Sequence, residues 1–175
     1  YEENVEMTKA VVRTAAVFDV DVEAELGHVG SGASVDDIVN SDNYTNVEQA
    51  VEFVEKTGCG SLAVAVGHAH GAYVQTPNLD FDRIKKLRAA VPVPLVLHGC
   101  SDIPHEQLQE SVRLGMSKFN IATEYFRACY ASISAAADPE NKNGSMMSIM
   151  NDASEGAIEF VRGKMRLLNP NGFSL

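Results

Sequence analysis

The sequence has no tryptophan, only three cysteines among 175 residues, and no long apolar run. Because a membrane-spanning helix needs about 20 consecutive apolar residues, we expect no segment that crosses a bilayer and no membrane partner. The cysteines, Cys59, Cys100 and Cys129, are odd in number and form no C-x-x-C motif. This pattern is typical of small buried thiols in a reducing compartment, so we expect a cytoplasmic protein.

Basic residues are also scarce: 14 lysines and arginines stand against 24 aspartates and glutamates, for a formal net charge of −10. Nucleic acids and anionic membranes bind basic surfaces, so the charge argues against both kinds of partner. The negative net charge does not argue against a small phosphorylated substrate. Backbone N–H groups at strand-to-helix turns, together with a bound metal, can hold phosphate without many lysines.

No low-complexity linker divides the chain, and its hydrophobic content of 45% is ordinary for a globular protein. We therefore expect residues 1–175 to form a single domain. The first residue is Tyr1 instead of Met, and the N-terminus has no signal-peptide pattern. We expect the segment to begin inside a longer polypeptide.

Short apolar runs alternate with amphipathic segments along the chain. Thr45, with Glu48 three residues later, is predicted to open a helix as a capping box, and Gly58 is placed to end it. Residues 27–44 are rich in Gly, Ser and Asp and are predicted to be a loop. The pattern predicts helices over residues 4–18, 45–57, 80–90, 104–114, 124–136 and 153–168, and strands over residues 20–26, 62–66, 94–97 and 118–121.

Strands that are buried on both faces and alternate with helices predict an α/β fold, in which helices cover a parallel sheet. Two architectures fit this pattern, a doubly wound open sheet and a (β/α)8 TIM barrel. The sequence supplies four predicted strands, whereas a closed barrel has eight strands and roughly 250 residues. If the fold is a TIM barrel, this chain covers about its C-terminal half.

A polar residue lies at or just beyond the C-terminal end of each predicted strand, namely Glu25, His70, His98 and Asn120. In both architectures that edge of the sheet carries the chemistry. Taken alone, His98 is explained equally well as a strand-end residue bonded to a backbone carbonyl, and His70 as a surface-loop residue. Together, one strand apart, they favour a metal-binding pair, because imidazole is the commonest metal ligand.

A catalytic zinc usually has three protein ligands and one open position, so two histidines are one ligand short. Glu25, on the preceding strand, is a ligand, a carboxylate that orients a ligand, or a polar residue of the barrel interior. His68 lies two residues before His70 and is expected to point elsewhere. His28 and His105 are expected to be loop residues.

A second group of residues suits a phosphate. Glycine directly after a strand lets a phosphate approach the backbone closely, and Gly71 and Gly99 have this position. Ser101 and Thr123 add hydroxyl donors, and Asn120 lies on the last predicted strand. Each glycine alone more often marks only a turn. A phosphate site near the terminal strands is common in barrel enzymes, which favours the functional interpretation.

Four segments together resemble the class II ketose-bisphosphate aldolases: Glu23–Gly27 (EAELG), Gly67–Gly71 (GHAHG), Val93–Asp102 (VPLVLHGCSD) and Asn120–Glu124 (NIATE). The similarity runs in register along most of the chain and is weakest over residues 27–44 and after Asp138. It implies a zinc-dependent (β/α)8 enzyme that cleaves fructose or tagatose 1,6-bisphosphate to dihydroxyacetone phosphate and glyceraldehyde 3-phosphate. It also implies Lewis-acid catalysis instead of a lysine Schiff base, and we expect a homo-oligomer.

The resemblance assigns roles to individual residues. His70 and His98 match two of the three zinc histidines of that family, with Glu25 as a further candidate. Asp102 and Ala122 look more like the tagatose-bisphosphate branch than the fructose-bisphosphate branch. The positions that match the binding site for dihydroxyacetone phosphate are Gly71, Gly99, Cys100, Ser101, Asn120, Ile121, Ala122 and Thr123.

The sequence also departs from the family. The third zinc histidine and the proton-donor aspartate of the family stand together on an early strand, and no Asp-His pair occurs here. We expect both upstream of Tyr1, so no catalytic acid is assigned within this chain. The family's loop after the Glu-Leu-Gly run usually carries Gly-Gly and an acidic residue that acts on the substrate. Here the loop is shortened and has no Gly-Gly, and whether Asp36 or Asp37 takes the acidic role stays open. Two other functions also stay open: a non-catalytic phosphosugar-binding fragment of the same fold, and a metal-dependent hydrolase.

Overall fold

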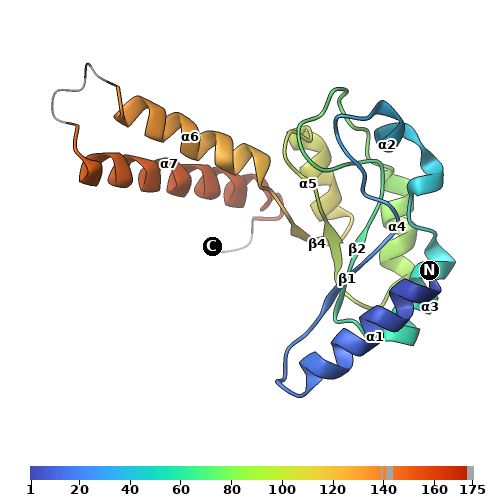
Figure 1. Ribbon diagram of the computed structural model, residues 1–175. Helices are drawn as coiled ribbons and strands as arrows, with labels where there is room; N and C mark the ends of the chain where they lie inside the picture. The colour runs from blue at the N-terminus through green and yellow to red at the C-terminus, as the bar shows by residue number, and fades with distance from the viewer. Residues whose placement is uncertain (139, 141–143, 173–175) are drawn as a thin grey trace.

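Four parallel strands form one sheet in chain order β1-β2-β3-β4, as Figure 1 shows for a computed structural model that describes residues 1–138, 140 and 144–172. Helices follow the strands in alternation, as the sequence predicts. The elements are α1 (Glu2–Ala16), β1 (Glu23–Leu26), α2 (Val35–Val39), the 3-10 helix η1 (Ser41–Asn43), α3 (Val47–Thr57), β2 (Ser61–Val64), α4 (Phe81–Ala90), β3 (Leu95–Leu97), α5 (His105–Arg113), β4 (Met116–Phe119), α6 (Thr123–Ala136) and α7 (Met146–Leu167).

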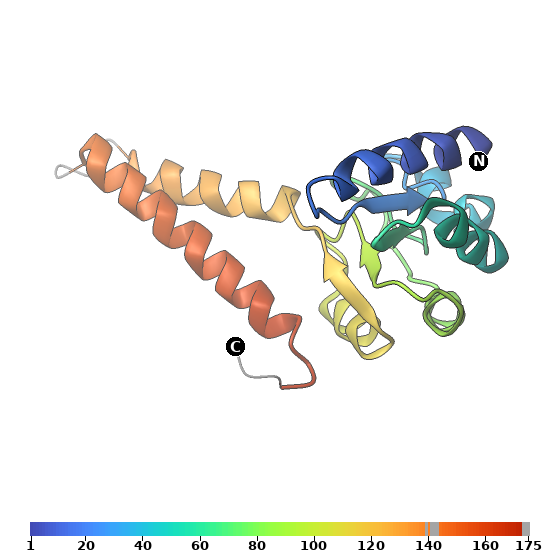
Figure 2. The same cartoon turned by 90° about the horizontal axis from the view of Figure 1, so that it is seen from below.

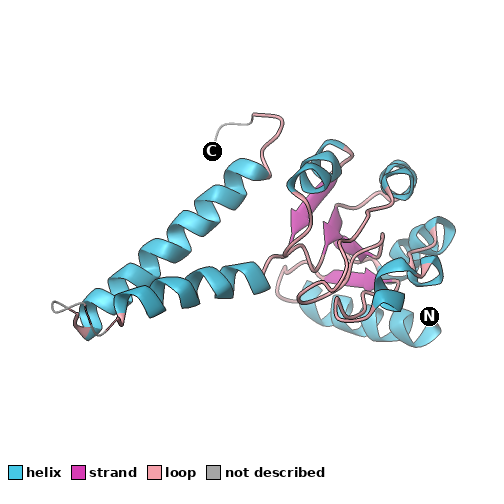
Figure 3. Ribbon diagram, turned by 90° about the horizontal axis from the view of Figure 1, so that it is seen from above, coloured by secondary structure: helices cyan, strands magenta, loops and turns pink. Residues whose placement is uncertain are grey.

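The two faces of the sheet differ in chemistry. One face packs against α3, α4 and α5, which lie along the same side of the strands (Figures 2 and 3). Leu62 and Leu95 from the strands join Phe53, Ile84 and Leu108 from these helices in one buried cluster. At about 25 cal/mol per Å² of buried apolar surface, such packing is the main force that holds the helices on the sheet.

The opposite face carries polar side chains, because side chains alternate between the faces along a strand. In β1, Ala24 and Leu26 are buried, while Glu23 and Glu25 are only partly buried. A register shift opposite Leu95 and Val96 brings Lys118 of β4 level with Val96. In a closed barrel this polar face would line the interior, which is where barrel enzymes place their reactive groups.

Most helix and strand expectations are confirmed, with bounds that shift by a few residues. Asp80 caps α4 by accepting a hydrogen bond from the Arg83 backbone N–H at 2.9 Å. Gly58 ends α3 in a left-handed conformation, with φ of 70°. The predicted strand over residues 118–121 lies two residues earlier, because Asn120 already belongs to the turn that follows β4.

Three expectations are wrong. Asn46, not Thr45, caps α3, because the Asn46 side chain accepts a hydrogen bond from Gln49 N–H. Thr45 is buried instead, where its hydroxyl donates to the Leu26 carbonyl and accepts from Ala65 N–H at 2.8 Å. Residues 27–44 are not only loop, since they contain α2 and η1. The last helix, α7, begins at Met146 and is longer than predicted.

The hairpin of α6 and α7 extends away from the sheet, as Figures 1 and 2 both show. The two helices pack mainly on each other, and α7 meets α5 near its C-terminal end, where Gln109 Nε2 donates to the Leu167 carbonyl at 3.3 Å. Among the described helices, none combines the length and the apolar character that crossing a bilayer would require.

Candidate metal and substrate site

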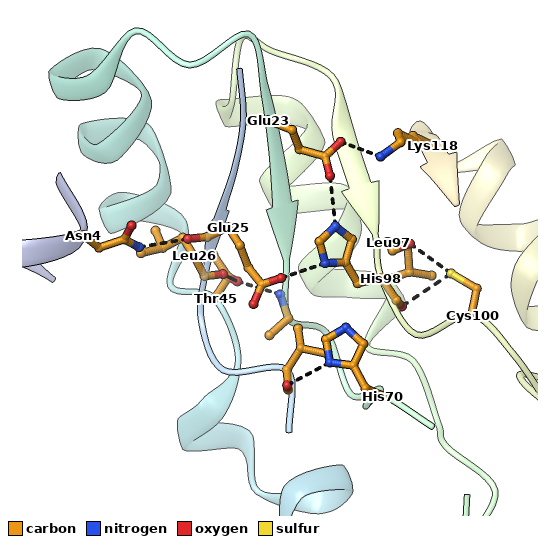
Figure 4. A network of polar contacts seen from close by, with 12 residues as sticks. Asn4, Glu23, Glu25, Leu26, Thr45, His70, Leu97, His98, Cys100 and Lys118 are labelled. Atoms are coloured by element: carbon orange, nitrogen blue, oxygen red, sulfur yellow. Dashed lines mark hydrogen bonds and ion pairs between the residues drawn. The ribbon is translucent and has the colours of Figure 1, made fainter. Parts of the chain in front are cut away.

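His98 lies just beyond the end of β3, and carboxylates flank both of its ring nitrogens (Figure 4). Nε2 is 3.0 Å from Glu23 Oε1, and Nδ1 is 2.7 Å from Glu25 Oε2. Both glutamates come from the polar face of β1, although β2 separates β1 from β3. The structure therefore places Glu23 and Glu25 in contact with His98, one on each ring nitrogen.

Glu23 is held on a second side by β4. Lys118 Nζ donates to Glu23 Oε2 at 2.8 Å, across the polar face of the sheet. Partial burial favours the neutral acid, but the hydrogen bonds from Lys118 and His98 outweigh it and hold the pKa of Glu23 below its ordinary value. The carboxylate is thus a fixed negative group that sets the orientation of the His98 ring.

His70 follows β2, and the loop after β1 fixes its position. Its backbone N–H donates to the Gly30 carbonyl at 2.8 Å, and its carbonyl accepts from Gly32 N–H at 2.7 Å. The ring Nδ1 lies 3.2 Å from the Val29 carbonyl. A carbonyl can only accept, so Nδ1 carries the proton and the lone pair of Nε2 is left available, as in many metal-binding histidines.

The two imidazoles lie next to each other, with ring centroids 5.9 Å apart and planes tilted by 44°. From Zn–N distances of 2.0–2.1 Å, two imidazoles on one tetrahedral zinc have centroids about 5–6 Å apart. Across residues 1–138, 140 and 144–172, no group of three His, Cys, Asp or Glu side chains is arranged to hold a metal ion. Within the described residues, the two imidazoles thus have a spacing that suits two ligands of one zinc ion.

Tyr73 connects the turn that carries His70 to the turn that carries His98 through hydrogen bonds. Its hydroxyl lies 2.7 Å from the Ala69 carbonyl and 2.9 Å from the Gly99 carbonyl, and it accepts from Ala69 N–H at 2.9 Å. Burial raises the pKa of Tyr73 to about 12, so the hydroxyl keeps the proton that it shares between the two carbonyls. The sequence analysis missed this residue, because nothing in its spacing separates it from an ordinary loop tyrosine.

Gly99 is required by close packing of the same two turns. It has φ of 57°, and a Cβ atom at this position would lie 2.1 Å from the Ala69 carbonyl oxygen. Any side chain here would push the turns after β2 and β3 apart. Gly71, by contrast, has φ of 91° and no atom within 4 Å of the position that a Cβ would take, so its surroundings are open.

The remaining predicted substrate residues lie where the turns after β3 and β4 meet. Cys100 N–H donates to the Asn120 carbonyl, and Asn120 N–H donates to the Leu97 carbonyl, both at 3.0 Å. The thiol of Cys100 is buried, its Sγ lies 3.0 Å from the Leu97 carbonyl, and burial raises its pKa to about 12. Cys100 therefore contributes its backbone N–H to this region, while its thiol is buried and protonated.

The N-terminus of α6 completes this region. Ile121 packs against the core, Ala122 precedes the helix and offers no side-chain cap, and Thr123 is its first residue. The Ser101 hydroxyl accepts from Glu124 N–H at 3.2 Å, which satisfies one of the free N–H groups of the first turn. Uncapped N–H groups at such a terminus favour an anion. The structure brings these residues together, and their role in binding substrate remains a prediction.

Whereas His70 is exposed, His68 is buried in the protein. It is 1% exposed, and neither of its ring nitrogens has a hydrogen-bond partner among the described residues. Burial, followed by the nearby His70 and His98, lowers the pKa of His68 to about 3, so the ring is neutral. The expectation that His105 is a loop residue is wrong, since it opens α5, while His28 lies in the loop after β1.

Comparison with known proteins agrees with this geometry. A model of the family "Fructose-bisphosphate aldolase class-II" matches residues 1–173. The chain belongs to the class-II fructose-bisphosphate aldolase family. One curated relative is "Uncharacterized protein YdjI" of Escherichia coli (strain K12), which is 38% identical over 172 residues, or 98% of this chain. The chain spans 60% of the length of that relative.

Solved structures of aldolases cover the chain in the same way. The crystal structure of the YdjI aldolase from Escherichia coli K12 has a TM-score of 0.82 and 36% identity, over 98% of this chain and 58% of that one. A putative fructose-1,6-bisphosphate aldolase from Coccidioides immitis has a TM-score of 0.80 and 25% identity, over 98% and 60%. The Campylobacter jejuni fructose-bisphosphate aldolase, with a TM-score of 0.77 and 22% identity, shows the shared fold alone. The four parallel strands are thus part of an aldolase TIM barrel.

Proposed function

We propose that this chain carries part of the active site of a zinc-dependent aldolase that acts on a ketose 1,6-bisphosphate, tagatose or fructose. The reaction cleaves the sugar to dihydroxyacetone phosphate and glyceraldehyde 3-phosphate, or runs in the condensing direction. The observation that carries the proposal is the pair of His70 and His98, which lie side by side at the C-terminal edge of the sheet. The proton on His70 Nδ1 is donated to the Val29 carbonyl. A zinc ion bound there would supply Lewis-acid polarisation of the substrate oxygens.

The residues around the pair have supporting roles in this proposal. His98 must exchange one of its two carboxylate partners for the metal. Glu23 is also anchored by Lys118, so we infer that it keeps the ring in place through Nε2. Nδ1, on the side of Glu25 and His70 in Figure 4, is then the nitrogen that binds zinc. The third histidine and the aspartate that exchanges the proton at the C4 hydroxyl are expected outside residues 1–175.

Metal removal tests the proposed reaction. A polypeptide extended to the length of its relatives is expected to release dihydroxyacetone phosphate from one of the two bisphosphates. We expect a chelator to abolish this release and added Zn²⁺ to restore it, because zinc polarises the substrate oxygens. Both sugars are assayed in parallel with a coupled dehydrogenase. Hydrolysis to inorganic phosphate would favour the metal-dependent hydrolase, and binding without turnover would favour the phosphosugar-binding fragment.

Replacing Ser101 with alanine tests the predicted phosphate site. The loss of one hydrogen bond to a charged group costs about 1.5–3 kcal/mol, which corresponds to roughly 10- to 150-fold weaker binding of dihydroxyacetone phosphate. Calorimetry measures that affinity. Because Ser101 also accepts from Glu124 N–H, thermal unfolding is measured on the same sample, with Ser117→Ala as a matched exposed control. A lower melting temperature with unchanged affinity would show that Ser101 only caps α6.

A further inference from the structure

The pairing between β2 and β3 ends before the chain reaches the two histidines of the candidate metal pair. The last paired residues of these strands are Ala63 and Val96. Beyond them each strand runs into a turn, and each turn carries one of the histidines. Within the described part of the chain, no backbone hydrogen bond joins residues 67–71 to residues 98–101. The pairing of the sheet therefore does not by itself fix the distance between the two imidazole rings.

The hydroxyl of Tyr73 connects the two turns where the strand pairing does not. It lies 2.7 Å from the Ala69 carbonyl and 2.9 Å from the Gly99 carbonyl, and it accepts from Ala69 N–H at 2.9 Å. Ala69 is the residue directly before His70. Gly99 is the residue directly after His98. A shift of either turn therefore changes a hydrogen bond of this hydroxyl only one residue away from a metal-binding candidate.

Tyr73 is itself held in place from two sides. Its ring packs against the hydrophobic core of the protein. The backbone N–H of the next residue, Val74, donates to the Gly32 carbonyl at 2.9 Å, which ties this segment to the loop after β1. A hydroxyl has one proton to donate and two lone pairs to accept with, and here it meets one N–H and two carbonyls. The hydroxyl is thus a fixed point to which both turns are bonded.

The same hydroxyl acts at the place where the two turns touch. A Cβ atom on Gly99 would lie 2.1 Å from the Ala69 carbonyl oxygen, which is one of the two carbonyl oxygens that the Tyr73 hydroxyl contacts. Close backbone packing sets how near the turns can come, because neither backbone can move further inward. The hydroxyl opposes the outward movement, because separating the turns would break a hydrogen bond to one of the carbonyls. The two effects together define one spacing of the turns.

We propose that Tyr73 is a positioning residue of the metal pair, whose hydroxyl sets the distance between the two imidazoles through the backbone of Ala69 and Gly99. The inference rests on the proposed function, since it takes His70 and His98 as metal ligands. Without the hydroxyl, the ring spacing of 5.9 Å is no longer fixed, and part of the binding free energy of the metal is used to restore it. Groups that orient metal ligands contribute about 10- to 100-fold to metal affinity, so a similar loss is expected here.

Replacing Tyr73 with phenylalanine tests this role, in a polypeptide extended to the length of its relatives. The change removes only the hydroxyl and keeps the ring in the core. We expect the zinc dissociation constant, measured by competition with a chromophoric chelator, to rise at least about tenfold. With Co²⁺ in place of zinc, the d–d absorption spectrum should also change, because it depends on the ligand geometry. Tyr44→Phe is the matched control, since its hydroxyl donates to the Ile38 carbonyl at 3.3 Å and bonds neither turn.

The control separates positioning from general stability. Circular dichroism and thermal unfolding are measured on all three proteins, and Tyr44→Phe should keep both the zinc dissociation constant and the cobalt spectrum of the unchanged protein. Equal weakening in the two variants would mean a general loss of stability. An unchanged constant and spectrum in Tyr73→Phe would mean that the hydroxyl does not position the pair. Either result overturns this inference and leaves the proposed function standing, whereas an unchanged protein that binds no zinc would reject both.

Discussion

Replacing His98 with alanine is expected to abolish zinc binding and aldol turnover together. The proposed site has three protein ligands, of which His98 is one, and even partners that only orient a ligand contribute about 10- to 100-fold to metal affinity. We therefore expect zinc affinity to fall by more than about 100-fold. Zinc content after dialysis, measured together with turnover, reports both effects. His105→Ala, at the exposed start of α5, is the matched control and should change neither.

His70→Ala provides a second variant in case the first perturbs folding. Removing the His98 ring leaves Glu23 and Glu25 without their shared partner, whereas the His70 ring has only the Val29 carbonyl as a hydrogen-bond partner within the described residues. Circular dichroism checks that both variants are folded. If folded His70→Ala and His98→Ala proteins each retain one zinc per chain, the assignment of the metal pair is wrong.

A polypeptide of residues 1–175 by itself is expected to have no measurable turnover. Among the residues that the structure describes, no strand pairs with the outer edges of β1 and β4, and open edges favour association with other chains. The described residues hold no complete group of three metal ligands. Without the expected aspartate, general acid–base catalysis worth about 10²- to 10⁴-fold is also lost. The assay compares this polypeptide, with added Zn²⁺, against one extended to the length of its relatives.

Equal rates for the two polypeptides would contradict this expectation. The acid and the third ligand would then have to lie among Glu25, Asp36, Asp37 and His68. In the structure, some of these residues are better placed than others to act as an acid or a metal ligand. Asp37 accepts from Ser31 N–H at 2.8 Å and holds its own loop together, and His68 is buried. Glu25, beside His98, would be the first residue to replace.

Periodicity and strand-end chemistry predicted much of the fold and the candidate metal pair. Apolar runs of four or five residues locate β2 and β3, and the polar residues that follow them locate one edge of a parallel sheet. Two histidines at the ends of neighbouring strands must lie close together, and His70 and His98 do. These predictions succeed because they depend on local pattern and on the geometry that all parallel sheets share.

The contacts that set the fine geometry were not predictable from the sequence. Thr45 has the pattern of a helix cap, but its hydroxyl bonds to Leu26 and Ala65, which are distant in sequence. The same holds for the hydroxyl of Tyr73, which reaches Gly99. In each case contacts with residues distant in sequence determine the structure, because the local sequence is compatible with more than one role for the side chain.

The most direct test of the central claim is anomalous diffraction at the zinc edge, from crystals of a polypeptide extended to the length of its relatives. If His70 and His98 bind the catalytic metal, one anomalous peak per chain should lie about 2.0–2.1 Å from a ring nitrogen of each histidine. We expect the His70 contact through Nε2, because Nδ1 is bonded to Val29. A zinc peak elsewhere in the protein, with the rings of His70 and His98 still bonded only to Val29, Glu23 and Glu25, would contradict the account.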